Sequence, residues 1–127
     1  MSHQFKKHYT RAEARALLPL VRLWLKRIIQ LCNELQKAET RLGKLMGPGL
    51  DIGGPAVNSC LRTQADLKQV MLEFHRREIQ IKDLQRGLLD FPAIVDGKEV
   101  FLCWEEGEED IEFWHELDTG YAGRKPL

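Results

Sequence analysis

The chain of 127 residues is 43% hydrophobic and 30% charged, a composition that is typical of one globular domain (1–127) and excludes a wholly disordered chain. Its formal net charge is zero, but residues 1–87 hold sixteen Lys and Arg against eight Asp and Glu, whereas residues 88–127 hold three against eleven. The two parts either attract each other, or the basic part faces an anionic partner. Arg22 and Lys26 interrupt the apolar stretches near the N-terminus, so we expect no membrane span, no secretory signal and a cytoplasmic protein.

The first predicted helix covers residues 10–46. Thr10 and Glu13 form a capping box, in which each side chain bonds to the backbone amide of the other residue. Apolar residues then recur at alternating intervals of four and three, which is typical of a coiled-coil seam. The seam consists of Leu17, Val21, Trp24, Ile28, Leu31, Leu35, Ala38, Leu42 and Leu45. The connection Gly47-Pro48-Gly49 ends this helix.

The second predicted helix covers residues 55–84, and Gly87 is its expected left-handed cap. Its seam consists of Val57, Cys60, Gln64, Leu67, Met71, Phe74, Glu78 and Ile81. If the connection is centred near Asp51, the two helices form an antiparallel hairpin. Its facing pairs are then Leu35 with Leu67, Leu31 with Met71, Ile28 with Phe74, and Trp24 with Glu78.

The helices carry more apolar residues than one hairpin can bury. The additional residues are Leu18, Leu25, Ile29 and Cys32 on the first helix and Leu61 and Val70 on the second. Part of this surplus can lie under the sheet, and the rest favours the packing of hairpins into a four-helix bundle. We therefore expect a homodimer or a higher homo-oligomer that forms through the helices.

A three-stranded antiparallel β-meander is predicted over residues 88–116. Asp96-Gly97 favours a type I′ turn between the first two strands. The predicted strands are 88–95, 98–105 and 110–115. The fold class is therefore α+β, a long antiparallel two-helix coiled-coil hairpin followed by a small meander.

Several segments together form a specific pattern. They are Gly87-Leu88-Leu89-Asp90-Phe91-Pro92-Ala93, Asp96-Gly97-Lys98-Glu99-Val100, Leu102-Cys103-Trp104, Trp114-His115-Glu116 and Gly123-Arg124-Lys125-Pro126-Leu127. With the helix opening Tyr9-Thr10 through Ala16-Leu17-Leu18-Pro19-Leu20, they resemble an uncharacterised bacterial family, domain of unknown function 2203. The resemblance covers nearly the whole chain. It implies a fold and a bacterial or archaeal cytosolic setting, but no activity.

Seven residues of the meander and the tail form the candidate ligand-binding set. They are Asp90, Cys103, Trp104, Trp114, His115, Glu116 and Arg124. Their types include metal ligands and one nucleophile–base pair, Cys103 with His115. No two of them have a spacing diagnostic of a metal site, so we expect no metal and identify no cofactor. Cys32, Cys60 and Cys103 also lack C-x-x-C spacing, which predicts three free, buried thiols.

The strand register decides whether Cys103 and His115 can meet. The predicted hairpin places Asp90 opposite Cys103. A four-residue turn at 106–109 then places His115 opposite Val100 on the core face, while Cys103 lies on the other face. On this prediction the nucleophile–base pair does not form. A bulge or an earlier strand end would restore it, because a shift of one residue turns every side chain to the other face.

The C-terminal tail, residues 117–127, is short and glycine-rich, so it holds a conformation only when docked. We expect it to fold back over the meander, where Arg124 pairs with Asp90 or Glu116 in a forked geometry. That pair would close one wall of a pocket beside Trp114 and His115. Any ligand site is therefore predicted under the tail.

The sequence leaves three functions open. The leading one is a non-enzymatic, self-associating module with a protein-interaction or small-ligand surface on the meander. The second is weak nucleic-acid or anionic-polymer binding by a basic helical face, although no nucleic-acid motif is present and a solvated face is favoured. That face consists of Arg11, Arg15, Arg22 and Lys26. The third is an enzyme or metal site that uses Asp90, Cys103, His115 and Arg124.

Overall fold

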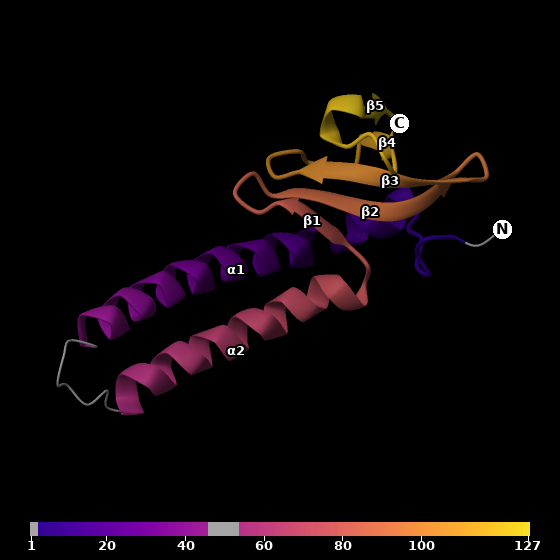
Figure 1. Ribbon diagram of the computed structural model, residues 1–127. Helices are drawn as coiled ribbons and strands as arrows, with labels where there is room; N and C mark the ends of the chain where they lie inside the picture. Colours follow the sequence, from indigo (N-terminus) through magenta and orange to yellow (C-terminus); the bar gives the residue numbers. More distant parts are fainter. Residues whose placement is uncertain (1–2, 46–53) are drawn as a thin grey trace.

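The computed structural model describes residues 3–45 and 54–127 and contains two antiparallel helices followed by a five-stranded antiparallel sheet. Helix α1 spans Arg11–Leu45 and helix α2 spans Gly54–Arg76. The two helices form a long arm, and the sheet lies over the N-terminal half of α1 (Figure 1). The predicted α+β class is confirmed. The expected connection around Gly47 lies outside the described residues, within which no helix is long and apolar enough to cross a membrane.

Helix α1 begins with the predicted capping box. The amide of Thr10 donates to Glu13 Oε1 at 2.9 Å, and the amide of Glu13 donates to Thr10 Oγ1 at 3.1 Å. The buried face of the helix contains Ala14, Leu18, Val21, Leu25, Ile28 and Leu31. Leu18 and Leu25 are each 1% exposed because they pack in the core beneath the sheet. This part of the apolar surplus therefore gives no support for self-association.

Helix α2 is shorter than predicted, because it ends at Arg76 and not at residue 84. Glu78 adopts a left-handed backbone conformation with φ of 58°, which a helix cannot continue through. Ile79 then enters the core at 3% exposure. The Trp24 ring packs on Phe74 with centroids 5.5 Å apart, and the Glu78 carboxylate accepts from the amides of Lys6 and Lys7.

The sheet has the order β1-β2-β3-β4-β5, so the predicted three-stranded meander lacked one strand at each edge. Strand β1 (Gln80–Asp83) falls within the predicted second helix, and strand β5 (Lys125–Pro126) falls within the tail. Gly87 is not a helix cap but lies in the turn between β1 and β2, with φ of 65°. A Cβ atom there would lie 2.6 Å from the Cβ of Glu106, so only glycine fits.

Strands β2 (Leu88–Val95) and β3 (Lys98–Glu105) form the predicted hairpin. Their register places Asp90 opposite Cys103, as the two-residue turn requires. Asp96 and Gly97 both have positive φ, at 51° and 78°. A type I′ turn needs this conformation at both positions.

Strand β4 (Phe113–Glu116) pairs with β3 one residue away from the predicted register. His115 lies opposite Phe101, and Glu116 takes the place opposite Val100. The prediction was wrong because the connection from β3 spans residues 106–112, with Ile111 fully buried, and is not a four-residue turn. The shift turns His115 to the face of Cys103 and turns Trp114 to the core face.

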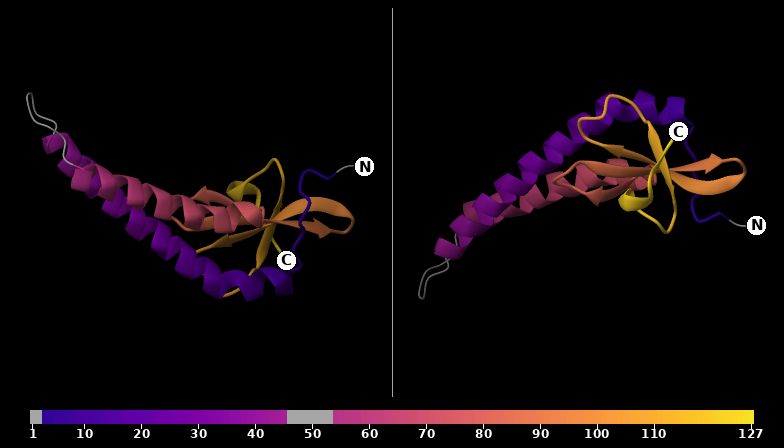
Figure 2. Two further views of the ribbon diagram at one scale, coloured as in Figure 1. Left: turned by 90° about the horizontal axis from the view of Figure 1, so that it is seen from below. Right: turned by 90° about the horizontal axis from the view of Figure 1, so that it is seen from above.

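Both faces of the sheet are covered. The core lies between α1 and the face that contains Leu89, Phe91, Ala93, Val100, Leu102 and Trp104. Residues 3–8 and the tail cover parts of the opposite face, where Phe5 packs on Phe101 with ring centroids 5.4 Å apart. In both views of Figure 2 the N-terminal segment runs past the β2–β3 hairpin. The face that carries Asp90 and Cys103 is thus also shielded from solvent.

Candidate functional site

Three side chains from three neighbouring strands converge on the face of the sheet away from α1. Asp90 comes from β2, Cys103 from β3 and His115 from β4, and each residue is 1% exposed. Their carboxylate, sulfur and imidazole ligand atoms all lie within 4.8 Å of one another. We call this group the strand cluster. The prediction that Cys103 and His115 occupy opposite faces is wrong, as a direct result of the one-residue shift in β4.

Hydrogen bonds determine where the protons of the strand cluster lie. His115 Nδ1 is 2.7 Å from the carbonyl oxygen of Glu116, and because a carbonyl only accepts, Nδ1 carries a hydrogen. His115 Nε2 is 2.9 Å from Asp90 Oδ1, so one further proton lies between these two atoms. Burial raises the pKa of the Asp90 carboxyl, and the hydrogen bond from His115 opposes that rise. The pair carries no net charge whichever atom holds the shared proton.

Cys103 completes the strand cluster as a neutral thiol. Burial, followed by the nearby Asp90 carboxylate, raises the pKa of Cys103 to about 12. A thiol with such a pKa is a poor nucleophile at neutral pH. Both ring nitrogens of His115 are bonded to other groups, so the imidazole is not directed at the sulfur as a base. The geometry does not support the predicted nucleophile–base pair.

Arg124 fixes the tail beside this cluster. Its guanidinium forms the expected fork, but with Glu108 and not with Asp90 or Glu116. Nη1 lies 3.2 Å from Oε1 and Nη2 lies 2.9 Å from Oε2 of Glu108. The guanidinium also stacks 3.9 Å from the ring centroid of Phe113, and Nη1 reaches to 4.0 Å from Cys103 Sγ.

Three of the predicted site residues lie apart from the strand cluster. Trp104 is fully buried on the core face, where Nε1 donates to the carbonyl of Glu108 at 2.8 Å. Trp114 is half-buried on the same face, against the core. Glu116 lies at the surface and pairs with Lys98 at 2.9 Å. Their roles in the structure are packing and surface pairing.

A pocket of about 320 Å³ opens over Asp90 and His115. Its remaining lining residues are Lys82, Leu88, Phe101, Leu117, Asp118, Thr119, Gly120 and Tyr121. Residues 117–121 of the tail form one wall, beside His115 but not beside Trp114, which lies on the other face, and Arg124 does not line the pocket. Lys82 was missed because it lies in a segment predicted as helix, and the sequence carries no signal that brings it to Asp90.

A family model described as Uncharacterized conserved protein (DUF2203) matches residues 7–127. The chain belongs to this family. The comparison with curated proteins found no match, and neither did the comparison with solved structures. The DUF2203 description states no activity, so the function has to be inferred from the geometry.

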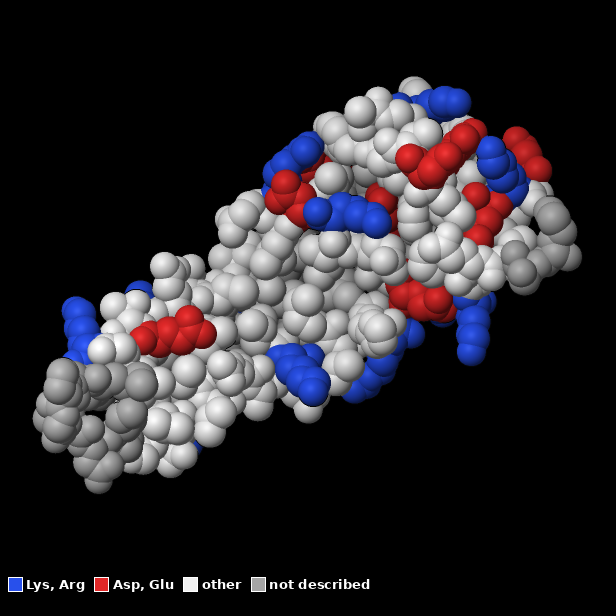
Figure 3. Space-filling model, in the orientation of Figure 1, with Lys and Arg blue, Asp and Glu red and all other residues white. Residues whose placement is uncertain are grey.

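The basic face of α1 meets an acidic segment of the same DUF2203 chain. Arg11 and Arg15 pair with Asp110 at 3.4 and 3.2 Å, and Arg22 donates to the carbonyl of Glu108 at 3.3 Å. Figure 3 shows carboxylates gathered over the sheet, with Lys and Arg among them, while the visible face of the helical arm carries fewer charges. These contacts partly neutralise the basic face of α1 within the molecule, which weakens the case for nucleic-acid binding.

Proposed function

We propose that the protein binds a thiophilic divalent metal ion, zinc in the first instance, through Asp90, Cys103 and His115. The main support is the convergence of a carboxylate, a thiol and an imidazole from three neighbouring strands. These are the three ligand types that zinc takes in proteins, and three protein ligands leave one tetrahedral position open. Asp90 and His115 also line the pocket, which lies on the side of the sheet away from the core.

The surroundings of the strand cluster favour such a role. A metal-ligating histidine usually donates its second ring N–H to a carbonyl or a carboxylate. His115 does so through Nδ1 to the Glu116 carbonyl, which directs Nε2 toward Asp90 and Cys103. The Arg124 guanidinium beside Cys103 Sγ stabilises a thiolate, and Glu108 balances the charge of Arg124.

Charge balance gives the proposal a quantitative consequence. A dication, the Asp90 carboxylate, the Cys103 thiolate and a neutral His115 carry no net charge together, just as the protonated cluster does. Binding therefore releases two protons, one from the thiol and one that Asp90 and His115 share. While both remain bound in the free protein, the apparent affinity rises about 100-fold per pH unit.

Cobalt(II) titration of untagged protein tests the site directly, because cobalt occupies zinc sites and thiolate coordination produces a charge-transfer absorption. We expect this band in the wild type and its loss in Cys103→Ser. Cys32→Ser, a change at a half-buried thiol on α1, is the matched control and should keep the band.

A second variant separates metal binding from a purely structural cluster. His115→Gln removes the imidazole ligand and should weaken cobalt binding by at least tenfold, as followed by competition with a chelator. Circular dichroism identifies variants that fail to fold. If folded wild-type protein shows no thiolate–cobalt band up to pH 8.5, the strand cluster only joins β2, β3 and β4, and the proposal is wrong.

Self-association through the helices and a cytoplasmic location are part of the same proposal. Leu23 and Leu61 remain 63% and 56% exposed, which leaves apolar surface on both helices for a second copy of the chain. Light scattering at micromolar concentration tests this point. A mass of 14.7 kDa, that of the single chain, would contradict it.

A further inference from the structure

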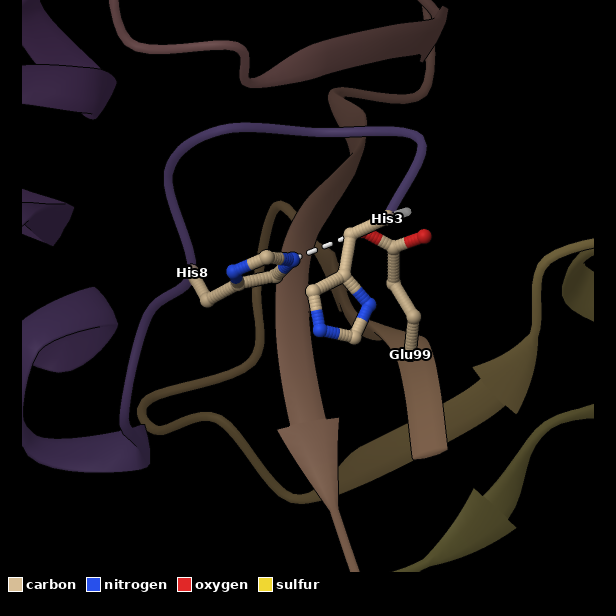
Figure 4. A group of neighbouring side chains, drawn as sticks. All are labelled: His3, His8 and Glu99. Carbon is tan, nitrogen blue, oxygen red and sulfur yellow. Dashed lines mark hydrogen bonds and ion pairs between the residues drawn. The ribbon is translucent and has the colours of Figure 1, made fainter. Parts of the chain in front are cut away.

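A second group of potential metal ligands lies at the N-terminal end of the fold, outside the site described above. It contains His3, His8 and Glu99, whose ligand atoms lie within 4.8 Å of one another. Figure 4 shows the three side chains pointing toward one another, two from the N-terminal segment and one from β3. His8 Nε2 lies 2.7 Å from Glu99 Oε2, and the rings of His3 and His8 meet edge to face with centroids 5.0 Å apart. We call this group the N-terminal cluster.

The carboxylate of this cluster is held in place before any ion binds. Glu99 Oε1 accepts from the amide of Gln4 at 2.8 Å, and Oε2 accepts from the amide of Phe5 at 3.0 Å. The side chain of Glu99 is 9% exposed and that of His8 is 20% exposed. Burial opposes ionisation of Glu99, but the hydrogen bonds from His8, Gln4 and Phe5 prevail and lower its pKa. The two backbone amides therefore hold the Glu99 carboxylate in a fixed position.

We propose that His3, His8 and Glu99 bind a divalent transition-metal ion of the class that prefers imidazole ligands, such as Ni²⁺ or Zn²⁺. Two imidazoles and one carboxylate form a ligand set used for such ions, with further positions left to water. Neighbouring ligand atoms on one such ion are about 3 Å apart, given bonds of roughly 2.1 Å. The His8–Glu99 distance of 2.7 Å is already close to this value, so both side chains can bind one ion with little movement.

Binding at the N-terminal cluster would clip residues 3–8 to the start of β3. Two ligands come from this segment. Its amides at Gln4 and Phe5 donate to Glu99, and those at Lys6 and Lys7 donate to Glu78. The ion adds a connection between the segment and the sheet that does not depend on the strand cluster. Metal binding should therefore make the N-terminal segment more ordered.

Titration of full-length untagged protein with Ni²⁺ tests the proposal, followed by calorimetry and by paramagnetic broadening of backbone amide signals. In Cys103→Ser, which lacks the thiol ligand of the strand cluster, we expect broadening confined to residues near 3–8 and 98–100. The affinity of this site should fall at least tenfold when His3→Gln or His8→Gln is added. His75→Gln is the matched control, because His75 is an exposed histidine on α2 outside both clusters. It should change the affinity by less than twofold.

Trypsin digestion gives a readout that does not rely on affinity. Lys6 and Lys7 lie between the two histidine ligands, so Ni²⁺ should slow cleavage after them in the wild type and in Cys103→Ser, but not in His3→Gln. Cleavage that Ni²⁺ does not slow in the wild type would overturn the proposal. An equal loss of Ni²⁺ affinity in His3→Gln and in His75→Gln would also overturn the proposal. Because Cys103→Ser keeps this site, the two metal proposals fail separately.

Discussion

Replacing Arg124 by alanine should loosen the tail and destabilise the whole fold. The guanidinium binds both carboxylate oxygens of Glu108 and stacks on the rings of Phe113 and Tyr121, with centroids 3.9 and 4.3 Å away. The side chains of Arg124 and Glu108 are only 15% and 19% exposed, so water screens their attraction weakly. A bonded charge pair of this kind contributes about 2 kcal/mol, and each stacked ring adds roughly 0.5 kcal/mol. We expect Arg124→Ala to lower the free energy of unfolding by about 3 kcal/mol.

A double-mutant cycle measured by urea unfolding isolates the contribution of the pair. Glu108→Gln is a suitable partner change, because glutamine Oε1 can still accept from the amide of Glu105, which bonds to Glu108 Oε1 at 2.8 Å. The coupling between Arg124→Ala and Glu108→Gln should be about 1.5 kcal/mol. Arg124→Lys keeps the charge but loses the fork and the planar stack, so it should lose about half as much stability as alanine.

Fluorescence reports on the tail itself. Trp114 pairs with Lys125 across β4 and β5, and the Lys125 ammonium lies 5.3 Å from its ring centroid. Release of the tail should therefore increase acrylamide quenching in Arg124→Ala while the far-ultraviolet circular dichroism changes little. A coupling energy below about 0.5 kcal/mol, with quenching as in the wild type, would refute the view that this pair pins the tail.

Three further predictions follow from the burial of single residues. Leu25→Glu places a charge at a site 1% exposed beneath the sheet, so it should unfold the chain, by about 4 kcal/mol or more, instead of releasing folded monomers; a folded variant in thermal melts would contradict this. Thiol titration without reductant should find three free thiols after unfolding, and the buried Cys60 and Cys103 should react slowly before it; fewer than three indicates a disulfide. Because burial raises the pKa of Cys103 from 9.0 to about 12, its contribution to stability is complete below pH 9 and declines up to pH 12, by at most about 1.4 kcal/mol per pH unit. Urea titrations of Cys103→Ala should show a smaller decline, and part of what remains comes from Tyr9, whose pKa is also raised to about 12 by burial.

The parts of the fold that the sequence predicts correctly are those with strong local signals. Asp96-Gly97 combines two residues that tolerate positive φ, and the alternating apolar residues on both sides leave one register in which the core face is apolar. The capping box of Thr10 and Glu13 is equally local. In each case the residues that determine the conformation lie next to one another in the chain.

The errors occur where contacts distant in sequence decide the conformation. Phe74, Glu78 and Ile81 continue a helical period, but pairing of β1 with β2 and burial of Ile79 override it. The register of β4 depends on how the connection packs, because Ile111 enters the core within it. No local pattern at 106–112 shows that seven residues, and not four, separate the two strands.

The candidate site was predicted only in part for the same reason, because contacts distant in sequence bring its residues together. Asp90, Cys103 and His115 were named from their residue types, yet the predicted register separated two of them by a single position. The sequence does not predict the group of His3, His8 and Glu99, because Glu99 lies 91 positions after His8 and 96 after His3. A histidine five residues after another is no signal in itself, and only the docking of the N-terminal segment creates the group.

The docking of the N-terminal segment also depends on the progress of synthesis on the ribosome. The amides of Gln4 and Phe5 bond to Glu99, 95 and 94 residues further along the chain, and the amide of Tyr9 bonds to the carbonyl of Pro92 at 2.7 Å. Residues 4–9 are therefore synthesised well before the partners that hold them, and contacts of such separation close slowly. A nascent chain that stalls shortly before residue 99 leaves residues 4 and 5 without their carboxylate partner and open to proteases.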